Sequence, residues 1–161
     1  MVFAAMQAGC GYYFVGRGSV PYKEVRSICI GTFRNTTAEA GIENIFTKAA
    51  IAEFARGKWL QIDCSNPDVE LQGKIKDYRI IPAFFTNEDN ITGYQVSVVM
   101  EVFLVRKSTG DVLWKDTALS GTDSSTASEE ILTAKSNEMD TVSRIAKTLM
   151  ESLYNRLSQN F

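Results

Sequence analysis

The chain has 161 residues, of which 45% are hydrophobic and 22% are charged, and its formal net charge is −2. These values are typical of one globular domain. A slightly negative net charge does not provide the strongly positive surface that nucleic-acid-binding proteins usually have, so we expect no nucleic-acid partner. The sequence contains no histidine, which removes the commonest general base and the commonest zinc ligand. We therefore predict no catalytic residue, no metal site and no cofactor.

Near the N-terminus, Cys10 follows the small residues Ala8 and Gly9, behind a short apolar stretch. Small residues directly before a cysteine are what the bacterial lipoprotein signal peptidase requires. Acyl chains on such a cysteine, at roughly 0.8 kcal/mol per buried methylene, hold a protein at a membrane surface. Residues 1–8 contain no Lys or Arg, however, and Gln7 stands where a large apolar residue is usual. A chance cysteine and a lipoprotein signal that is truncated or has a misassigned start therefore both remain open here.

The first half of the chain predicts a strand and then a helix. Residues 11–24 contain glycines and a proline that break helices, so we expect an extended segment there. Residues 25–33 carry apolar side chains on both faces of a predicted strand, as a central strand does. From residue 41 to residue 56, apolar residues recur at the spacing of an amphipathic helix, and residues 59–62 could begin a short strand.

Three further strands are predicted in the second half. Apolar and polar residues alternate over 69–81, where we expect Pro82 to end the strand. The alternation over 94–105 is the strongest in the chain, and a hairpin loop leads from there into a strand over 111–119. The polar loop over 86–90 separates the first two of these strands.

After a polar segment that predicts a linker over 120–128, an apolar stripe from residue 129 onward predicts a long helix. The order of elements predicts an α/β (α+β) two-layer sandwich, with a mixed four-stranded sheet and two helices on one face, in the order β-α-β-β-β-α. Cys29 and Cys64 could form a disulfide in an oxidising compartment. They could also be two small buried side chains, which is the interpretation we favour.

With these elements in place, the chain resembles the LptE family of lipopolysaccharide-assembly lipoproteins over nearly its whole length after residue 8. The resemblance is carried by the order and spacing of four stretches, which are Gly9-Cys10-Gly11-Tyr12, the strand-turn-helix Ile28–Glu43, the strand Asp68–Ile75 and the hairpin Gly110–Trp114. It implies that Cys10 is lipidated and that residues 1–9 are the remnant of a lipoprotein signal peptide. Residues 10–161 would then form a single LptE-like domain, with 10–24 as an extended tether.

The resemblance also implies a function. A protein of this kind is a non-enzymatic, lipid-anchored protein of the outer membrane of Gram-negative bacteria. It plugs the lumen of the β-barrel protein LptD, assists the assembly of that barrel, and binds lipopolysaccharide during transport to the outer leaflet. The composition fits a second hypothesis equally well, namely a generic periplasmic lipoprotein or binding module that serves another envelope process.

Lipopolysaccharide carries phosphates and acyl chains, so we expect Lys or Arg beside apolar surface at its binding site. Lys135 lies in the stretch AKSNE, which is similar to one in family members whose lysine is linked to lipopolysaccharide binding. A lone lysine on a helix is also commonly just solvated. Reversing its charge to Glu should weaken lipopolysaccharide binding and leave association with the barrel intact.

Some family members place a basic residue in the loop between the two central strands, but here Asn87–Asn90 is acidic. We expect Lys74, Lys76 and Arg79 to substitute for it. A sheet covered on one face leaves the other face for a partner, and there we expect apolar contacts from the residues Val99, Phe103 and Val105. A further segment of this chain, such as residues 12–20, could instead cover that patch.

Overall fold

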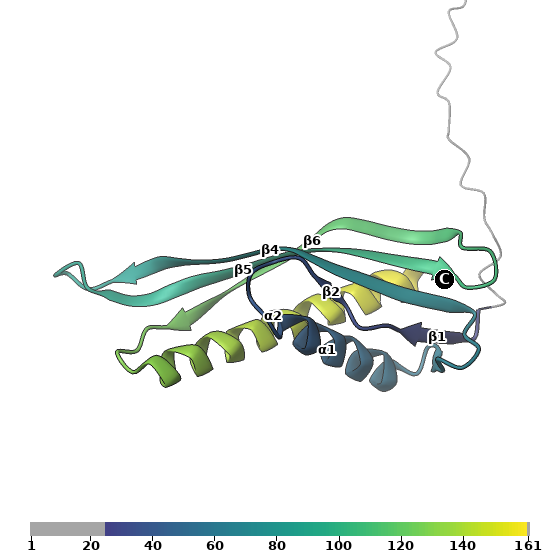
Figure 1. The fold of residues 1–161 in the computed structure, drawn as a ribbon, viewed down its shortest axis with the longest axis horizontal. Helices are drawn as coiled ribbons and strands as arrows, with labels where there is room; N and C mark the ends of the chain where they lie inside the picture. The colour runs from purple at the N-terminus through teal and green to yellow at the C-terminus, as the bar shows by residue number, and fades with distance from the viewer. Residues whose placement is uncertain (1–24, 161) are drawn as a thin grey trace, which may run out of the picture.

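The structure, a computed structural model, describes residues 25–160 and confirms the predicted two-layer α+β architecture (Figure 1). One layer is a mixed sheet and the other is a pair of helices on one of its faces. The strands are β1 (Ser27–Ile30), β2 (Arg34–Asn35), β3 (Gln61–Ile62), β4 (Val69–Phe85), β5 (Ile91–Arg106) and β6 (Val112–Thr126). The helices are α1 (Ile42–Gly57) and α2 (Ile131–Asn160).

The sheet has six strands in the order β3-β1-β4-β5-β6, with β2 also paired to β4, so the predicted count of four is corrected. Strand β1 pairs in parallel with both β3 and β4, and β2 pairs in parallel with β4. Strands β4, β5 and β6 form an antiparallel meander. The strand predicted over 25–33 ends at Ile30, and beyond it Phe33 turns into the core against the backbone of Gly73. A Cβ atom at Gly73 would lie only 2.6 Å from the Phe33 ring, so this contact requires glycine.

Two strands are longer than predicted because strand pairing overrides the local signal. β4 continues through Pro82 to Phe85. Beyond Ile75 it pairs only with β5, so its other edge is free, and a proline without an N–H group is tolerated there. The polar segment 120–126, predicted as a linker, is the second half of β6. Its backbone pairs with β5 as far as Gly93↔Thr126, so polar side chains on this edge strand do not prevent pairing.

The core lies between the two layers. In the middle of β5, from Val96 to Leu104, every second residue points under the helices and is fully buried, and these residues are Val96, Val98, Met100, Val102 and Leu104. Apolar residues of α1 and α2, such as Phe46, Phe54, Met150 and Leu153, cover them with no exposed surface. Two ion pairs fasten α2 to β6, namely Asp116 to Arg156 at 2.8 Å and Asp123 to Arg144 at 2.7 Å.

Cys29 on β1 and Cys64, in the turn after β3, form a disulfide with their Cα atoms 4.6 Å apart. The interpretation as two buried thiols was wrong, because Cys64 is exposed and Cys29 is only half-buried. The two residues come together because β3 pairs in parallel with β1, which brings the segment after β3 beside Cys29. The bond closes a separation of 35 residues that includes all of α1.

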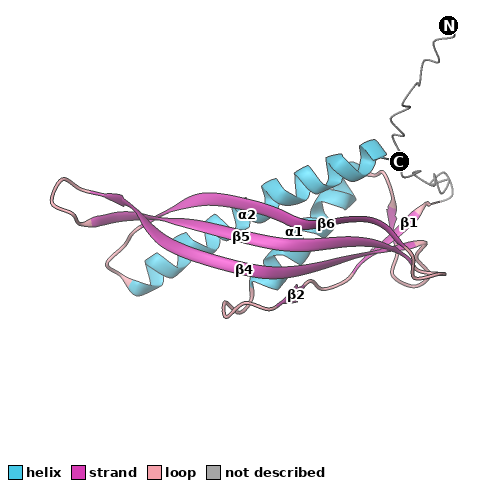
Figure 2. Cartoon of the chain, turned by 90° about the horizontal axis from the view of Figure 1, so that it is seen from above, coloured by secondary structure: helices cyan, strands magenta, loops and turns pink. Residues whose placement is uncertain are grey.

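The β4–β5 hairpin is long and extends beyond the N-terminal start of α2 (Figure 2). Its strands have 17 and 16 residues, which at about 3.3 Å per residue gives a length of about 50 Å. We call the hairpin segment 80–91, together with Ile131 and Leu132 at the start of α2, the distal end. The opposite end of the sheet, with β1, β3, α1 and the disulfide, is the proximal end.

Candidate interaction surfaces

The face of the sheet that the helices leave uncovered carries the residues expected to contact a partner. Val99, Phe103 and Val105 alternate with the buried residues of β5, so they lie on this open face, where each is half-buried among its neighbours. Their placement on one uncovered face agrees with the alternation in the sequence. No described segment of the chain covers them as a further strand or helix.

Three of the predicted cations lie on the same open face. Lys74 is the pairing neighbour of Glu101, and Arg79 is the neighbour of Ser97. Lys76 lies at a register shift between the two and donates a hydrogen bond from Nζ to Glu101 Oε1 at 2.8 Å. That hydrogen bond is the chief reason why the pKa of the Glu101 carboxyl is lowered, and the charges of Lys76 and Lys74 lower it further. Arg79 pairs with its neighbour Asp77 at 2.7 Å.

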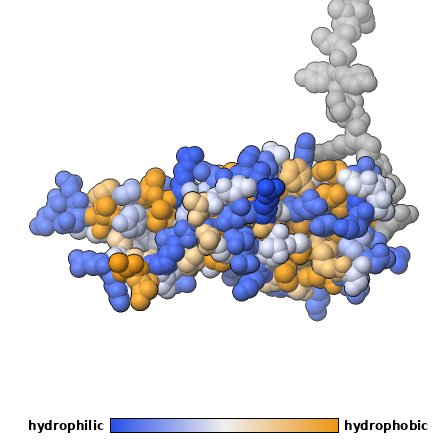
Figure 3. All heavy atoms as spheres, in the orientation of Figure 1, coloured by the Kyte–Doolittle hydropathy of each residue, from blue (hydrophilic) through white to orange (hydrophobic). Residues whose placement is uncertain are grey.

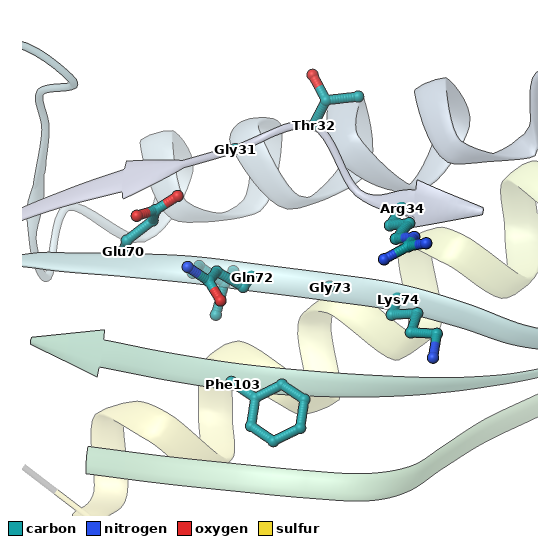
Figure 4. A pocket seen from close by; sticks show the side chains of 9 residues that line it. Gly31, Thr32, Arg34, Glu70, Gln72, Gly73, Lys74 and Phe103 are labelled. Atoms are coloured by element: carbon teal, nitrogen blue, oxygen red, sulfur yellow. The ribbon is translucent and has the colours of Figure 1, made fainter. Parts of the chain in front are cut away.

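A hollow of about 370 Å³ opens on this face between β4 and the segment that runs from Gly31 to Arg34. Figure 4 shows the side chains around it, with Glu70 at one end and Arg34 and Lys74 at the other. Gln72 and Phe103 form the floor between the two ends. Arg34 was not among the residues predicted from the sequence. Its place depends on the register of a two-residue strand, for which the sequence gives no signal.

Lys135 is separated from the other predicted cations because it belongs to the helix layer. Its Nζ atom donates hydrogen bonds to Glu39 at 2.7 Å and to Glu138 at 2.9 Å. Partial burial lowers the pKa of Lys135, but the hydrogen bonds and charges of these two carboxylates outweigh burial, so its pKa is raised overall. The positive φ of 92° at Gly41 delays the start of α1 to Ile42, which leaves Glu39 in the loop that reaches Lys135.

The same cluster includes Tyr78, whose hydroxyl donates a hydrogen bond to Glu138 Oε1 at 2.5 Å. Burial is the main cause of a raised Tyr78 pKa, and the nearby carboxylates raise it further, because both oppose a negative phenolate. Glu138 thus links β4 to Lys135 on α2. The predicted lipopolysaccharide-binding lysine is fixed in a network within the protein and still has a side chain that is 48% exposed.

The distal end presents exposed apolar residues, and one of them, Ile131, was expected to lie in the buried apolar stripe of the long helix. Phe84 and Phe85 are 47% and 55% exposed, and Ile131 and Leu132 are 83% and 78% exposed. Figure 3 shows hydrophobic residues at the surface of this end, on the left of the view, as well as toward the opposite end. The sequence contains a sign of this surface, because the residues around Pro82 form a continuous apolar run without alternating polar residues. The prediction that the strand ends at Pro82 left this run unexplained.

Cys10, the predicted lipidation site, and the tether over 10–24 lie outside the described residues. Within residues 25–160, neither helix has the combination of length and apolar composition needed to cross a bilayer. The same part of the chain contains no group of three or more Cys, Asp or Glu side chains placed to hold a metal ion.

The fold is shared with lipoproteins of known structure. A candidate lipoprotein from Caulobacter crescentus CB15 superimposes with a TM-score of 0.60 and 11% identity, covering 80% of this chain and 89% of that one. A minor lipoprotein from Acinetobacter baumannii gives a TM-score of 0.56 and 10% identity, covering 84% and 92%. At such low identity these similarities establish the fold alone. No curated protein matches the sequence.

One family matches the chain over the whole of the described fold except a few C-terminal residues. That family is LptE, described as lipopolysaccharide-assembly, and the match runs from residue 25 to residue 157. It includes both helices and all six strands, and with them the open face, the Lys135 cluster and the distal end. The chain belongs to the LptE family of lipopolysaccharide-assembly proteins.

Proposed function

We propose that this protein is an outer-membrane lipoprotein, anchored through acylated Cys10, that plugs the lumen of an LptD-like β-barrel and assists its assembly. In this role it binds lipopolysaccharide during transport and performs no chemistry of its own. The observation that carries the proposal is the family match over residues 25–157. The tether over 10–24 would connect the anchor to the domain.

The dimensions of the molecule support a role as a plug. The β4–β5 hairpin is about 50 Å long, which exceeds the total thickness of a bilayer with its headgroups, about 40 to 45 Å. A narrow sheet with one helix-covered face can extend through a barrel lumen of that height. The polar lumen of such barrels suits the mixed charged and apolar side chains of the open face.

The exposed side chains of the distal end support contact with a partner or a lipid. Large apolar residues gathered at one end of a protein commonly mark an interaction site. Phe84, Phe85, Ile131 and Leu132 provide such a surface within reach of Lys135, which lies one helical turn after Ile131 and Leu132. An amphiphile with phosphates and acyl chains would be complementary to this combination.

The main test is purification of the full-length acylated protein from its envelope, followed by mass spectrometry of bound partners. We expect a large outer-membrane barrel in stoichiometric amount. Recovery of the protein without a barrel, together with unchanged lipopolysaccharide export after its depletion, would instead support the second hypothesis, a binding module for another envelope process.

The assignment of the open face as the partner side can be tested with two matched variants. Phe103→Glu places a charge on the open face, and Ile51→Glu places one on an exposed apolar position of α1 in the other layer. We expect Phe103→Glu to reduce the yield of co-purified barrel and Ile51→Glu to leave it close to wild type. The reverse result would show that the helix layer faces the barrel.

The role of Lys135 needs a gentler variant than charge reversal. A carboxylate at this position would join Glu39 and Glu138, and like-charge repulsion could then weaken binding indirectly. Lys135→Gln removes the charge alone. We expect it to weaken binding to lipopolysaccharide and to leave barrel association intact, whereas the control Lys147→Gln, an exposed position further along α2, should bind normally.

A further inference from the structure

Arg34 and Lys74 form an unusual pair on the open face. They are directly paired residues of the parallel strands β2 and β4, and both side chains line the same end of the hollow described above (Figure 4). Arg34 is exposed and Lys74 is half-buried, so both charged groups can be reached from solvent. Like charges directly opposite each other on neighbouring strands destabilise a sheet.

Two carboxylates beside this pair, Glu101 opposite Lys74 on β5 and Glu70 in the lining of the hollow, each accept a hydrogen bond from another lysine. Glu101 accepts a hydrogen bond from Lys76 at 2.8 Å, and Glu70, at the far end of the hollow, accepts one from Lys107 at 3.1 Å. The other two cations of β4, Lys76 and Arg79, are each in an ion pair. Among the described residues, the side chains of Arg34 and Lys74 have no ion pair of their own, although Lys74 contributes to the field at Glu101.

The surroundings indicate which anion would fit. A guanidinium can form two parallel hydrogen bonds to a phosphate, and an ammonium can add a third point of charge. The side-chain amide of Gln72 offers a further donor, and the ring of Phe103 adds an apolar surface to the floor beside it. A volume of about 370 Å³ is at the lower end of the range for small-molecule sites, so there is room for a phosphate and part of the group that carries it.

We infer that Arg34 and Lys74 form a binding site for a phosphate monoester carried on an amphiphile, with Gln72 as a hydrogen-bond donor and Phe103 in contact with the apolar carrier. The bound phosphate would offset the repulsion between the two cations. This inference rests on the proposed function in one respect, which is that lipopolysaccharide would be the source of the phosphate. The site is distinct from the Lys135 cluster in the helix layer.

The site can be tested first with inorganic phosphate on the full-length acylated protein in detergent, at constant ionic strength, by following backbone amide signals. We expect saturable shifts at Gly31, Thr32 and Gly73, which line the hollow. Arg34→Gln and Lys74→Gln should each weaken phosphate binding on the order of tenfold. The control Lys48→Gln, on the exposed side of α1, should bind phosphate as wild type does.

Lipid A and its dephosphorylated form, in the same detergent, then identify the source of the phosphate. We expect lipid A to shift the same signals, dephosphorylated lipid A not to shift them, and the two Gln variants to weaken the effect. Equal phosphate binding by wild type and Arg34→Gln would overturn the site. Acetate binding as tight as phosphate binding would also overturn it and would indicate a carboxylate of a protein partner.

These results are separable from the proposed function. If Arg34→Gln loses phosphate binding but still co-purifies with the barrel, both proposals stand. If the wild-type protein binds lipid A at the hollow but no barrel co-purifies, the plug role fails and the phosphate site stands. If lipid A does not shift the signals of the hollow while inorganic phosphate does, the amphiphilic source is wrong.

Discussion

The proximal and distal ends of this sheet use similar apolar residues in opposite ways. At the proximal end, Phe33, Phe46 and Phe54 are buried beneath or within the helix layer, and a disulfide joins β1 to the segment after β3. At the distal end, Phe84 and Phe85 lie on a hairpin that extends past the helices and are about half exposed. The phenylalanines of the proximal end are therefore part of the core, whereas those of the distal end remain exposed to solvent.

This difference separates the residues that maintain the fold from those that remain available for binding. Burying apolar area stabilises a protein by about 25 cal/mol per Å², so residues that stay in water contribute little to the free energy of folding. The exposed phenylalanines at the distal end are thus available to release that free energy when a partner or lipid covers them. The comparison predicts that damage at the two ends will have different consequences.

The largest expected effect is a contrast between two Phe→Ala variants. Phe46→Ala removes a side chain with no exposed surface and should lower the free energy of unfolding by about 3 to 5 kcal/mol. Phe85→Ala removes one that is 55% exposed and should cost less than about 1 kcal/mol. Urea unfolding of the two variants measures both values.

Co-purification of the barrel should show the opposite order, with Phe85→Ala impaired and any folded Phe46→Ala protein close to normal. If Phe85→Ala proved as destabilising as Phe46→Ala, the distal end would belong to the core and the comparison would be wrong. The Ile51→Ala variant, at an exposed position of similar character on α1, controls for the loss of apolar surface alone.

The disulfide gives the second prediction, which concerns the proximal end alone. Replacing Cys29 and Cys64 together by serine frees a loop of 35 residues and should cost about 2 to 4 kcal/mol of unfolding free energy. Calorimetry or urea unfolding provides the value, and treatment of the wild type with a reductant should reproduce it. An unchanged midpoint in both cases would mean that strand pairing alone holds β1 beside β3.

The sequence predicted the parts of the fold that depend on local periodicity. The alternation along β5, which places Val98 in the core and Val99 on the open face, was visible in the residues. The two helices were visible for the same reason. What periodicity could not show is the register shift at Lys76, where one extra residue in β4 reverses which face each following residue occupies. Because of it, Tyr78 points toward α2.

Tyr78 provides the third prediction. Tyr78→Phe removes the hydrogen bond to Glu138 from a half-buried site and should cost about 1 to 2 kcal/mol near neutral pH. The pKa of Tyr78 is raised in the folded protein, so its contribution to stability is complete below the pKa of an unfolded tyrosine, about 10, and is lost as the pH rises above that value.

Unfolding free energies measured at increasing alkaline pH should therefore fall less steeply for Tyr78→Phe than for the wild type. The raised pKa of Lys135 adds a loss of the same sign, which both proteins share. Tyr154→Phe is the control, since that ring packs edge-on against Phe54 and its hydroxyl is not part of the Glu138 network. Parallel slopes for wild type and Tyr78→Phe would show that the hydroxyl does not depend on Glu138.

The candidate sites were less accessible to sequence reasoning than the fold. Lys74 and Phe103 could be named because both lie on strongly patterned strands. Arg34 could not, because it meets Lys74 only through a two-residue parallel pairing between residues 40 positions apart. The exposure of Phe84 and Phe85 depends on how far α2 extends beneath the hairpin, which is a property of the assembled layers.

The smallest expected effect concerns the open face and should be a gain. Arg34→Glu converts a like-charged pair into an opposite-charged pair with Lys74, so it should raise the free energy of unfolding by about 0.2 to 1 kcal/mol. Because both groups are accessible to solvent, the gain should be clear at low ionic strength and should shrink as salt is added.

Phosphate should stabilise the wild type, since a ligand that binds only the folded state raises the free energy of unfolding. The same addition should leave the stability of Arg34→Glu unchanged. A variant no more stable than the wild type at low ionic strength would mean that the two cations do not repel each other, and the physical reason for an anion at this position would be lost.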